Sequence, residues 1–126
     1  MGSPPLTLVK RRDFLACAAG TKAHLPAFTL QARQRNGAEP AGSLRVGYTC
    51  SKKLGNAVAR NRAKRRLREA ARAVLPLLGR PGWDYVLVGR PGETAARAFP
   101  AMIEDLRRAV DLVHKPGKRS NKGARG

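Results

Sequence analysis

Alternating apolar and polar residues predict two strands in the first half of the chain. Residues 27–35, AFTLQARQR, alternate with a period of two, and residues 44–50, LRVGYTC, do the same. This period is typical of a strand with one buried face. Because the turn-forming residues 36–43 lie between them, we expect the two strands to form an antiparallel pair. Residues 83–90, WDYVLVGR, are almost continuously apolar and predict a third, central strand.

Three segments have the spacing of helices. Residues 10–19 predict a short helix that stops at Gly20. Residues 56–75 predict a longer, basic helix, and residues 94–113 an amphipathic closing helix. The breakers expected to end the basic helix are Pro76, Gly79 and Pro81. Residues 22–25 are compatible with an extra short strand. The order of all these elements indicates a two-layer α/β or α+β sandwich.

The length of the chain indicates how many domains it forms, and its charge indicates what kind of partner it binds. Its 126 residues fit one small domain, which we place at residues 6–114, with a flexible start at 1–5 and a disordered basic tail at 115–126. The formal net charge is +18 and the pI is near 11.6. A domain with this charge repels itself, and binding to a nucleic acid neutralises it while releasing counterions.

The predominance of arginine among the cations favours a nucleic acid as the partner, and the apolar pattern disfavours a membrane. Of the 26 basic residues 18 are Arg, whose planar fork binds phosphate through two donors and stacks on bases. No apolar run reaches the roughly 18 residues that a membrane span needs, and the N-terminus has no signal-peptide pattern. We therefore expect a cytoplasmic protein without a membrane partner.

The residue types of protein active sites are sparse. Cys17 and Cys50 match no zinc spacing and are interpreted as buried free thiols. His24 and His114 lie on unrelated segments, where they offer no acid/base pair. The aspartates read as helix caps or solvated helix positions are Asp13, Asp84, Asp105 and Asp111. We expect no catalytic residue and no metal site on the protein.

The basic helix divides into an apolar stripe and a cationic side. At about 100° per residue, the stripe that faces the core contains Ala63, Leu67, Ala70, Ala71, Val74 and Leu78. The outward side contains Asn61, Lys64, Arg65, Arg68 and Arg72, with Arg60 at its edge. Arg62 and Arg66 lie on the other flank, where Glu69 can offset only one cation. Like charges four residues apart, and cations near a helix start, destabilise the helix, and a phosphate backbone would relieve both effects.

A groove beside the sheet is the second candidate binding surface. We expect Arg45 and Thr49 on the polar face of one strand, beside Thr29 and Gln31 of the next. Phe14 on the first helix, near the basic residue Arg11, would add a stacking ring, although an ordinary core position for Phe14 stays open. Lys52 and Lys53 follow the second strand. An aromatic ring between polar and cationic walls suits a single-stranded nucleic acid.

Three stretches resemble the protein subunit of bacterial ribonuclease P. They are FLACAAGTKAHLPAFTLQARQR, LRVGYTCSKKLGNAVARNRAKRRLREAAR and DYVLVGRP, which together span roughly residues 6–113. RNRAKRRLRE, preceded by SKKLGNAV, resembles the arginine-rich signature of that family. The resemblance implies an α+β sandwich of order α-β-β-β-α-β-α, with a mixed sheet and a left-handed βαβ crossover that carries the basic helix.

The resemblance also implies a function and a set of site residues. Catalysis belongs to the large RNA subunit with Mg²⁺, and the protein helps it to remove the 5′ leader of precursor tRNA. The resemblance assigns RNA contacts near the cleavage site to Arg60, Asn61, Lys64, Arg65 and Arg68, and places Phe14, Lys52 and Lys53 at or beside the leader cleft. Together with the residues placed by the sequence pattern, the set expected to bind RNA is Arg60, Asn61, Arg62, Lys64, Arg65, Arg68, Arg72, Lys52, Lys53 and Arg45. The set expected at the leader cleft is Phe14, Arg11, Thr29, Gln31 and Thr49. Gln31 stands where other members often have an aromatic residue, which weakens stacking there.

Three other classes fit the residues less well. A leucine-zipper factor that binds DNA needs its basic region to continue into a coiled coil, but breakers and a strand follow here. A nuclease acting alone needs paired carboxylates or histidines that this chain does not offer. A structural RNA-binding protein, such as a ribosomal one, fits the charge equally well, and only the signature disfavours it.

Overall fold

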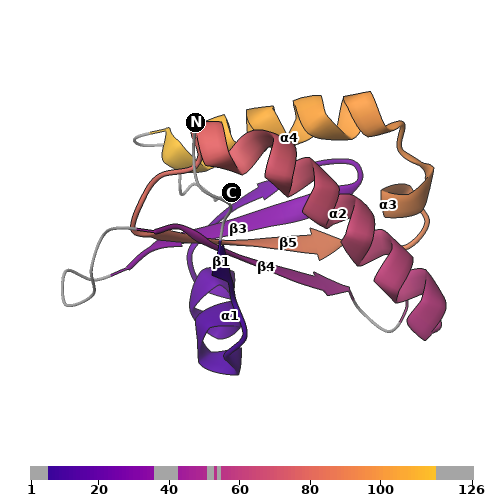
Figure 1. Cartoon of the computed structure of the whole chain (residues 1–126), viewed down its shortest axis with the longest axis horizontal. Helices are drawn as coiled ribbons and strands as arrows, with labels where there is room; N and C mark the ends of the chain where they lie inside the picture. Colours follow the sequence, from indigo (N-terminus) through magenta and orange to yellow (C-terminus); the bar gives the residue numbers. More distant parts are fainter. Residues whose placement is uncertain (1–5, 36–42, 51–52, 54, 116–126) are drawn as a thin grey trace.

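The computed structural model describes residues 6–35, 43–50, 53 and 55–115, and these form one mixed sheet with helices on its two faces (Figure 1). Its elements are β1 (Leu6–Thr7), α1 (Arg11–Ala18), β2 (Thr21–His24), β3 (Phe28–Gln34), β4 (Arg45–Cys50), α2 (Ala57–Leu78), β5 (Trp83–Gly89), α3 (Glu93–Ala96) and α4 (Phe99–His114). The strand order is β1-β4-β5-β3-β2. β5 runs parallel to β4 and antiparallel to β3, so the mixed α+β sheet and the central position of residues 83–90 are confirmed.

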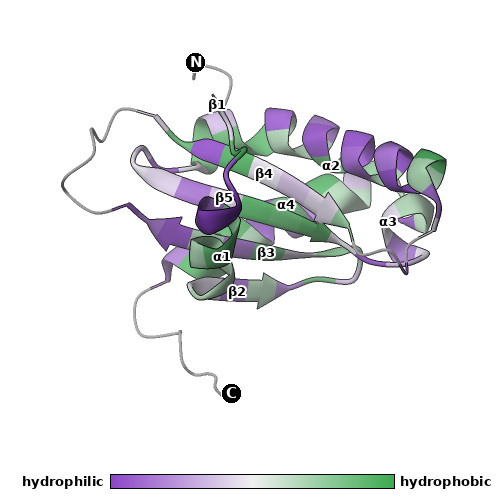
Figure 2. Cartoon of the chain, turned by 90° about the horizontal axis from the view of Figure 1, so that it is seen from below, coloured by the Kyte–Doolittle hydropathy of each residue, from purple (hydrophilic) through white to green (hydrophobic). Residues whose placement is uncertain are grey.

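The two faces of the sheet are covered differently. α2 and α4 pack side by side on one face, and α1 lies across the other (Figures 1 and 2). The main core, between the sheet and the pair α2 and α4, includes Phe28, Leu30 and Leu67. A smaller core under α1 contains Leu8, Cys17 and Val86, with Phe14 packed against it. The short cover on the α1 face leaves part of the sheet open.

The expected antiparallel pairing of the first two strands is wrong. β3 and β4 are not neighbours, because β5 lies between them and pairs with both. The reason lies in β5, where Tyr85 and Leu87 are buried on one face and Val86 on the other. A strand that is apolar on both faces is most stable in the centre of a sheet. The α2 crossover from β4 to β5 is confirmed as parallel, and its left-handed sense remains an expectation from the family.

The basic helix does not end where its first proline predicts. α2 continues through Pro76 to Leu78, and Gly79 closes it with an N–H donated to the Leu75 carbonyl over 2.8 Å. Leu75 is fully buried, and this packing offsets the cost of a proline inside the helix. Leu78, placed on the core stripe from the sequence, is 41% exposed, so Leu75 takes its place in the core.

The other boundaries differ in smaller ways. The helix expected at residues 94–113 is divided into α3 and α4 by extended residues at Arg97 and Ala98. The short strand near residues 22–25 is confirmed as β2, whereas β1 was not expected. The helix expected at residues 10–19 is confirmed as α1. Residues 1–5 and 116–126, predicted to be flexible and disordered, lie outside the described residues.

Candidate RNA interface

The cationic side of α2 faces away from the core, as its spacing predicts. Ala63, Leu67, Ala70, Ala71 and Val74 are buried against the sheet and α4. The exposed polar side chains of the helix are Asn61, Arg62, Arg65, Arg68, Glu69 and Arg72, while Arg60 and Lys64 are half-buried. Among the described residues, no carboxylate forms an ion pair with these cations, and Glu69 pairs with neither Arg65 nor Arg66.

The first turn of α2 is organised by two local hydrogen bonds. The Asn56 side chain accepts the backbone N–H of Ala59 over 3.0 Å and caps the helix. Arg60 Nη1 donates to the Gly55 carbonyl over 2.7 Å. Gly55 has a φ of 143°, a conformation that other residues adopt only with strain. Lys53 is exposed just before this turn, and Lys52 lies outside the described residues.

Two arginines of the helix contact the protein itself. Arg66 Nη2 donates to the carbonyl of Arg97, and its guanidinium lies 5.9 Å from the centre of the Phe99 ring. This side chain therefore ties α2 to the segment between α3 and α4. Arg68 stays exposed, with its guanidinium 5.5 Å from the centre of the Tyr48 ring on β4. That contact gives one outward arginine a defined position on the surface.

A cleft of about 480 Å³ lies between α1 and the sheet. Its lining residues are Val9, Arg11, Phe14, Leu15, Ala18, Gln31, Tyr48, Thr49, Val86 and Val88. Phe14 is half-buried: it packs on the small core, and it also lines the cleft. Gln31 and Thr49 are not on neighbouring strands, because Val86 and Val88 of β5 form an apolar floor between them. Thr29 lies outside the lining.

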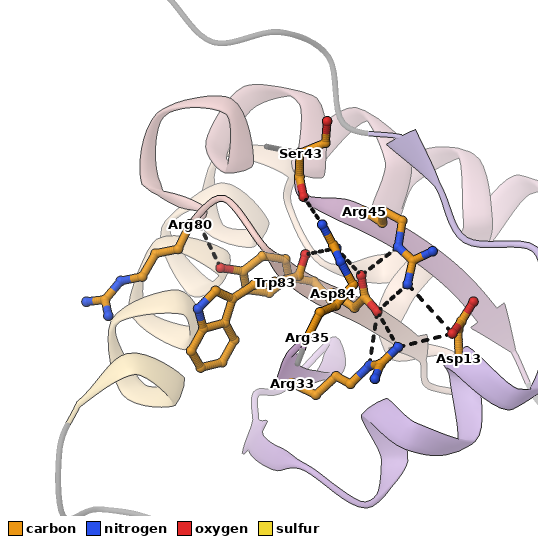
Figure 3. A network of polar contacts seen from close by, with 9 residues as sticks. Asp13, Arg33, Arg35, Ser43, Arg45, Arg80, Trp83 and Asp84 are labelled. Carbon is orange, nitrogen blue, oxygen red and sulfur yellow. Dashed lines mark hydrogen bonds and ion pairs between the residues drawn. The ribbon is translucent and has the colours of Figure 1, made fainter. Parts of the chain in front are cut away.

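Arg45 belongs to an ion-pair network rather than to the open surface (Figure 3). Its Nε and Nη2 each donate over 2.8 Å to the two carboxylate oxygens of Asp84. Arg33 and Arg35 contact the same carboxylate over 2.9 and 2.7 Å. Asp84 is fully buried; burial acts to raise its pKa, but the hydrogen bonds from Arg45 and Arg35 outweigh it and lower the pKa.

The expectation that the aspartates are caps or solvated positions is wrong for three of the four. Asp13 is 8% exposed and accepts from Arg33, so the network joins α1 to the sheet. Asp105 is 1% exposed and accepts two hydrogen bonds from Arg97. Asp111 alone is exposed, beside Lys115. An aspartate inside an apolar strand, as at residue 84, is the sequence signal of a buried ion pair, since a lone charge there would be too costly.

The thiols and histidines are packed into the fold to different degrees. Cys17 is fully buried, as expected, and burial raises its pKa to about 12. Cys50 is only half-buried. His114 Nε2 lies 2.7 Å from the Tyr85 hydroxyl, while His24 is exposed on β2. Within the described ranges, no three His, Cys, Asp or Glu residues are grouped as metal ligands, and no helix is long and apolar enough to span a membrane.

The fold and this surface define a small basic α+β protein that presents a cationic helix and an apolar cleft beside one sheet. A sequence model of the family described as Ribonuclease P matches residues 4–113. This match covers most of the chain, which therefore belongs to the ribonuclease P protein family.

Individual relatives agree with this assignment. The chain is 60% identical over 109 residues to the ribonuclease P protein component of Ruegeria pomeroyi, covering 86% of each chain. It is 48% identical over 103 residues to the protein of the same name from Caulobacter vibrioides, covering 82% of this chain and 67% of that one. The solved structure of the RNase P protein from Thermotoga maritima matches with a TM-score of 0.65 and 26% identity, covering 81% of this chain and 96% of that one.

Proposed function

We propose that this chain is the protein subunit of ribonuclease P, which binds the catalytic RNA and the single-stranded 5′ leader of precursor tRNA. In this role it assists the Mg²⁺-dependent removal of the leader that gives the mature 5′ end. One observation carries the proposal: the outward side of α2 holds a dense set of cations that form no ion pair with a described carboxylate, while the opposite side is anchored in the core. The assembly acts in the cytoplasm.

The helix is suited to contact an RNA backbone. The exposed Arg65 follows the half-buried Arg60 by five residues, and the exposed Arg68 follows the half-buried Lys64 by four, so each pair lies little more than one turn apart. Each guanidinium can grip a phosphate through two N–H groups. Phosphate contacts also remove the repulsion between neighbouring cations and release counterions. The contacts assigned to this helix are Arg60, Asn61, Arg62, Lys64, Arg65, Arg68 and Arg72, with Lys52 and Lys53 before it. Arg45 is withdrawn from this set because Asp84 already binds it through two hydrogen bonds.

The cleft is suited to an unpaired strand. Phe14 offers a ring and Val86 and Val88 an apolar floor, so bases can leave water there. Arg11 stands at the rim, where a backbone phosphate would pass, and Gln31 and Thr49 offer hydrogen bonds to base edges. Gln31 supplies no ring, so the rings that line this cleft are those of Phe14 and Tyr48, and Tyr48 also contacts Arg68.

The chemical step belongs to the RNA subunit, which holds the Mg²⁺ ions. The most buried carboxylates of the described residues, Asp84 and Asp105, are neutralised by arginines and so are engaged in the fold. The protein contributes positioning: it holds the leader in the cleft while α2 contacts the RNA beside the cleavage site. Binding energy gained away from the reacting bond then favours the correctly placed substrate.

Reconstitution tests the proposal directly. The purified full chain alone is expected not to cleave precursor tRNA. Together with the large RNA of a bacterial ribonuclease P at physiological Mg²⁺, it is expected to give cleavage at the mature 5′ end, with tighter binding when a leader is present. Cleavage by the RNA-free protein would contradict the proposal, and so would an RNA enzyme that the protein leaves unchanged.

A further inference from the structure

The sheet face that α1 covers has compensated charges at one end and uncompensated ones at the other. Three cross-strand rows of side chains make up this face. One row is Arg33, Asp84 and Arg45, where the carboxylate neutralises its neighbours. The next is Lys22, Gln31, Val86 and Gly47, and the last is His24, Thr29, Val88 and Thr49. α1 contacts the first two rows through Asp13 and Phe14, and its ribbon does not extend over the tips of β2, β4 and β5 (Figure 2). The last row lies at these tips and is called the open row; of its members, Val88 packs against the small core under α1.

A cation is fixed over this open row. Arg90 follows β5 directly, and its Nη2 donates to Thr29 Oγ1 over 3.2 Å. Its backbone is held by the fully buried Thr94, whose hydroxyl accepts the Arg90 N–H over 2.8 Å and donates to the Ala27 carbonyl over 2.6 Å. Thr94 thus joins the loop after β5 to the residue before β3. Because the Arg90 backbone is held in this way, its side chain extends across the sheet to Thr29 on β3.

Thr29 links this cation to a histidine. His24 Nδ1 lies 3.1 Å from Thr29 Oγ1, and the ring is exposed on β2. In the tautomer in which Nδ1 accepts the Thr29 hydroxyl proton, the ring carries its proton on Nε2, which is then a donor to solvent. Lys22 is exposed two residues earlier on the same face.

Donors therefore converge here without an acceptor of opposite charge. Arg90 has five N–H donors, and one of them is directed to Thr29; its Nε is buried without a hydrogen-bond partner in the described part of the chain. No described carboxylate forms an ion pair with Lys22, His24 or Arg90. By contrast, Arg33 and Arg45 on the same face are both bound by Asp84.

The position of Lys22, His24 and Arg90 relative to the cleft indicates which anion they would bind. Thr49 and Val88 belong to the open row and also line the cleft, and Lys22 is the cross-strand partner of Gln31, another lining residue. The donors therefore continue the cleft towards the β2 edge of the sheet. An unpaired strand lying in the cleft brings its backbone over them.

We propose that Arg90, Thr29 and His24 form a binding site for one backbone phosphate of the RNA strand that occupies the cleft, with Lys22 at its edge. The site rests on the proposed function, since the cleft strand is the leader of precursor tRNA. It holds a phosphate rather than a base, so it registers the length of the leader and not its sequence.

The test uses the holoenzyme reconstituted from the full chain and the large RNA. Precursor tRNAs carry leaders of about two or about ten nucleotides, lengths below and within the range of single-strand binding sites. Arg90→Met and His24→Ala are each expected to weaken binding of the long-leader substrate by about three- to tenfold, and of the short-leader substrate by less than about twofold. Arg107→Met removes an exposed charge on α4, and its effect should be the same for the two leaders.

A second measurement identifies the bound group. Neutral methylphosphonate linkages are introduced singly along the long leader. The wild-type holoenzyme should lose affinity at one linkage, and Arg90→Met should be insensitive to that same substitution, as in a double-mutant cycle. The inference is overturned if Arg90→Met and His24→Ala bind the long leader as the wild type does, or lose the same factor on both leaders. It is also overturned, together with the proposed function, if the wild type itself does not prefer the long leader.

Discussion

Arg45 on β4 and Asp84 on β5 are cross-strand partners joined by two parallel hydrogen bonds, each of 2.8 Å. Arg33 approaches the same carboxylate from the opposite neighbour, β3. The central strand thus carries one buried negative charge that fixes the two strands beside it. Through Asp13 the same network holds α1, which forms one wall of the cleft.

Replacing the Asp84 carboxylate should lower the free energy of unfolding more than replacing any surface charge. Asp84→Asn keeps the shape of the side chain but leaves Arg33, Arg35 and Arg45 without their shared anion. Breaking a buried ion pair from one side typically costs about 3–5 kcal/mol. We expect a loss of this size in the free energy of unfolding, measured by urea denaturation. Glu69→Gln, at an exposed position that forms no ion pair with another described residue, is the control and should change it by less than about 0.5 kcal/mol. A loss below about 1 kcal/mol for Asp84→Asn would contradict the role of the network.

The stability of the fold should decrease in mild acid because of His114. Burial, and secondly the charge of Arg80, lower the His114 pKa from 6.5 to about 4. The Tyr85 hydroxyl accepts the Arg80 N–H and so donates its own proton to Nε2, which requires a neutral acceptor there. A lowered histidine pKa contributes stability that is complete above pH 6.5 and is lost as the pH falls towards 4.

The measurement is the free energy of unfolding between these two pH values. His114→Gln should flatten this part of the curve, whereas His24→Asn, at an exposed ring, should retain it. The Asp84 pKa is lowered instead, so its contribution persists through this window and is lost only at more acid pH. If the free energy of unfolding of His114→Gln changes with pH as it does in the wild type, the acid sensitivity comes from other groups.

Gly47 should be required for the shape of the cleft. A Cβ at this position would lie 2.6 Å from two ring carbons of Phe14 and 3.1 Å from Leu8 Cβ. Gly47→Ala therefore has to displace the ring, at a cost of about 1–3 kcal/mol in the free energy of unfolding. Phe14→Leu in the same chain should recover part of that loss, because the smaller side chain makes room. Strictly additive losses in this cycle would show that the two residues do not compete for space.

Substitutions at two neighbouring arginines of α2 should have different effects, one on stability and the other on RNA binding. Arg66→Ala removes a hydrogen bond to the Arg97 carbonyl and a contact with Phe99, so we expect it to lower the free energy of unfolding by about 1–2 kcal/mol. Arg65→Ala, at an exposed position, should leave it within about 0.5 kcal/mol but weaken the assembly with the large RNA. Denaturation and filter binding on the same two proteins provide the comparison. The opposite ranking would mean that the facing of the helix is wrong.

The sequence was sufficient to predict most elements and the facing of α2. Period-two and helical patterns depend on local burial, so they locate strands and helices well, and Ala63 and Leu67 are buried as their spacing predicts. The separation of β3 from β4 by β5 was missed, because partner choice depends on which strand is buried on both faces. Leu75 was missed as a core residue because tertiary packing carries the helix past Pro76.

The candidate site was predictable only in part. Arg45 looked like a surface cation because its partner, Asp84, lies 39 residues away in the chain. The phosphate site proposed at Arg90 depends on a register between β2, β3 and β5 that no local pattern shows. The cationic helix was found because its charge density is local.

The central claim is that the outward side of α2 binds the large RNA of ribonuclease P. It is tested most directly by sequencing the RNA that co-purifies with the tagged full chain from cells. We predict strong enrichment of that RNA and of precursor tRNAs that retain 5′ leaders. Enrichment should be lost in Arg65→Ala/Arg68→Ala and retained in Arg107→Met. Recovery of mainly ribosomal RNA, or equal recovery with the α2 double variant, would contradict the account.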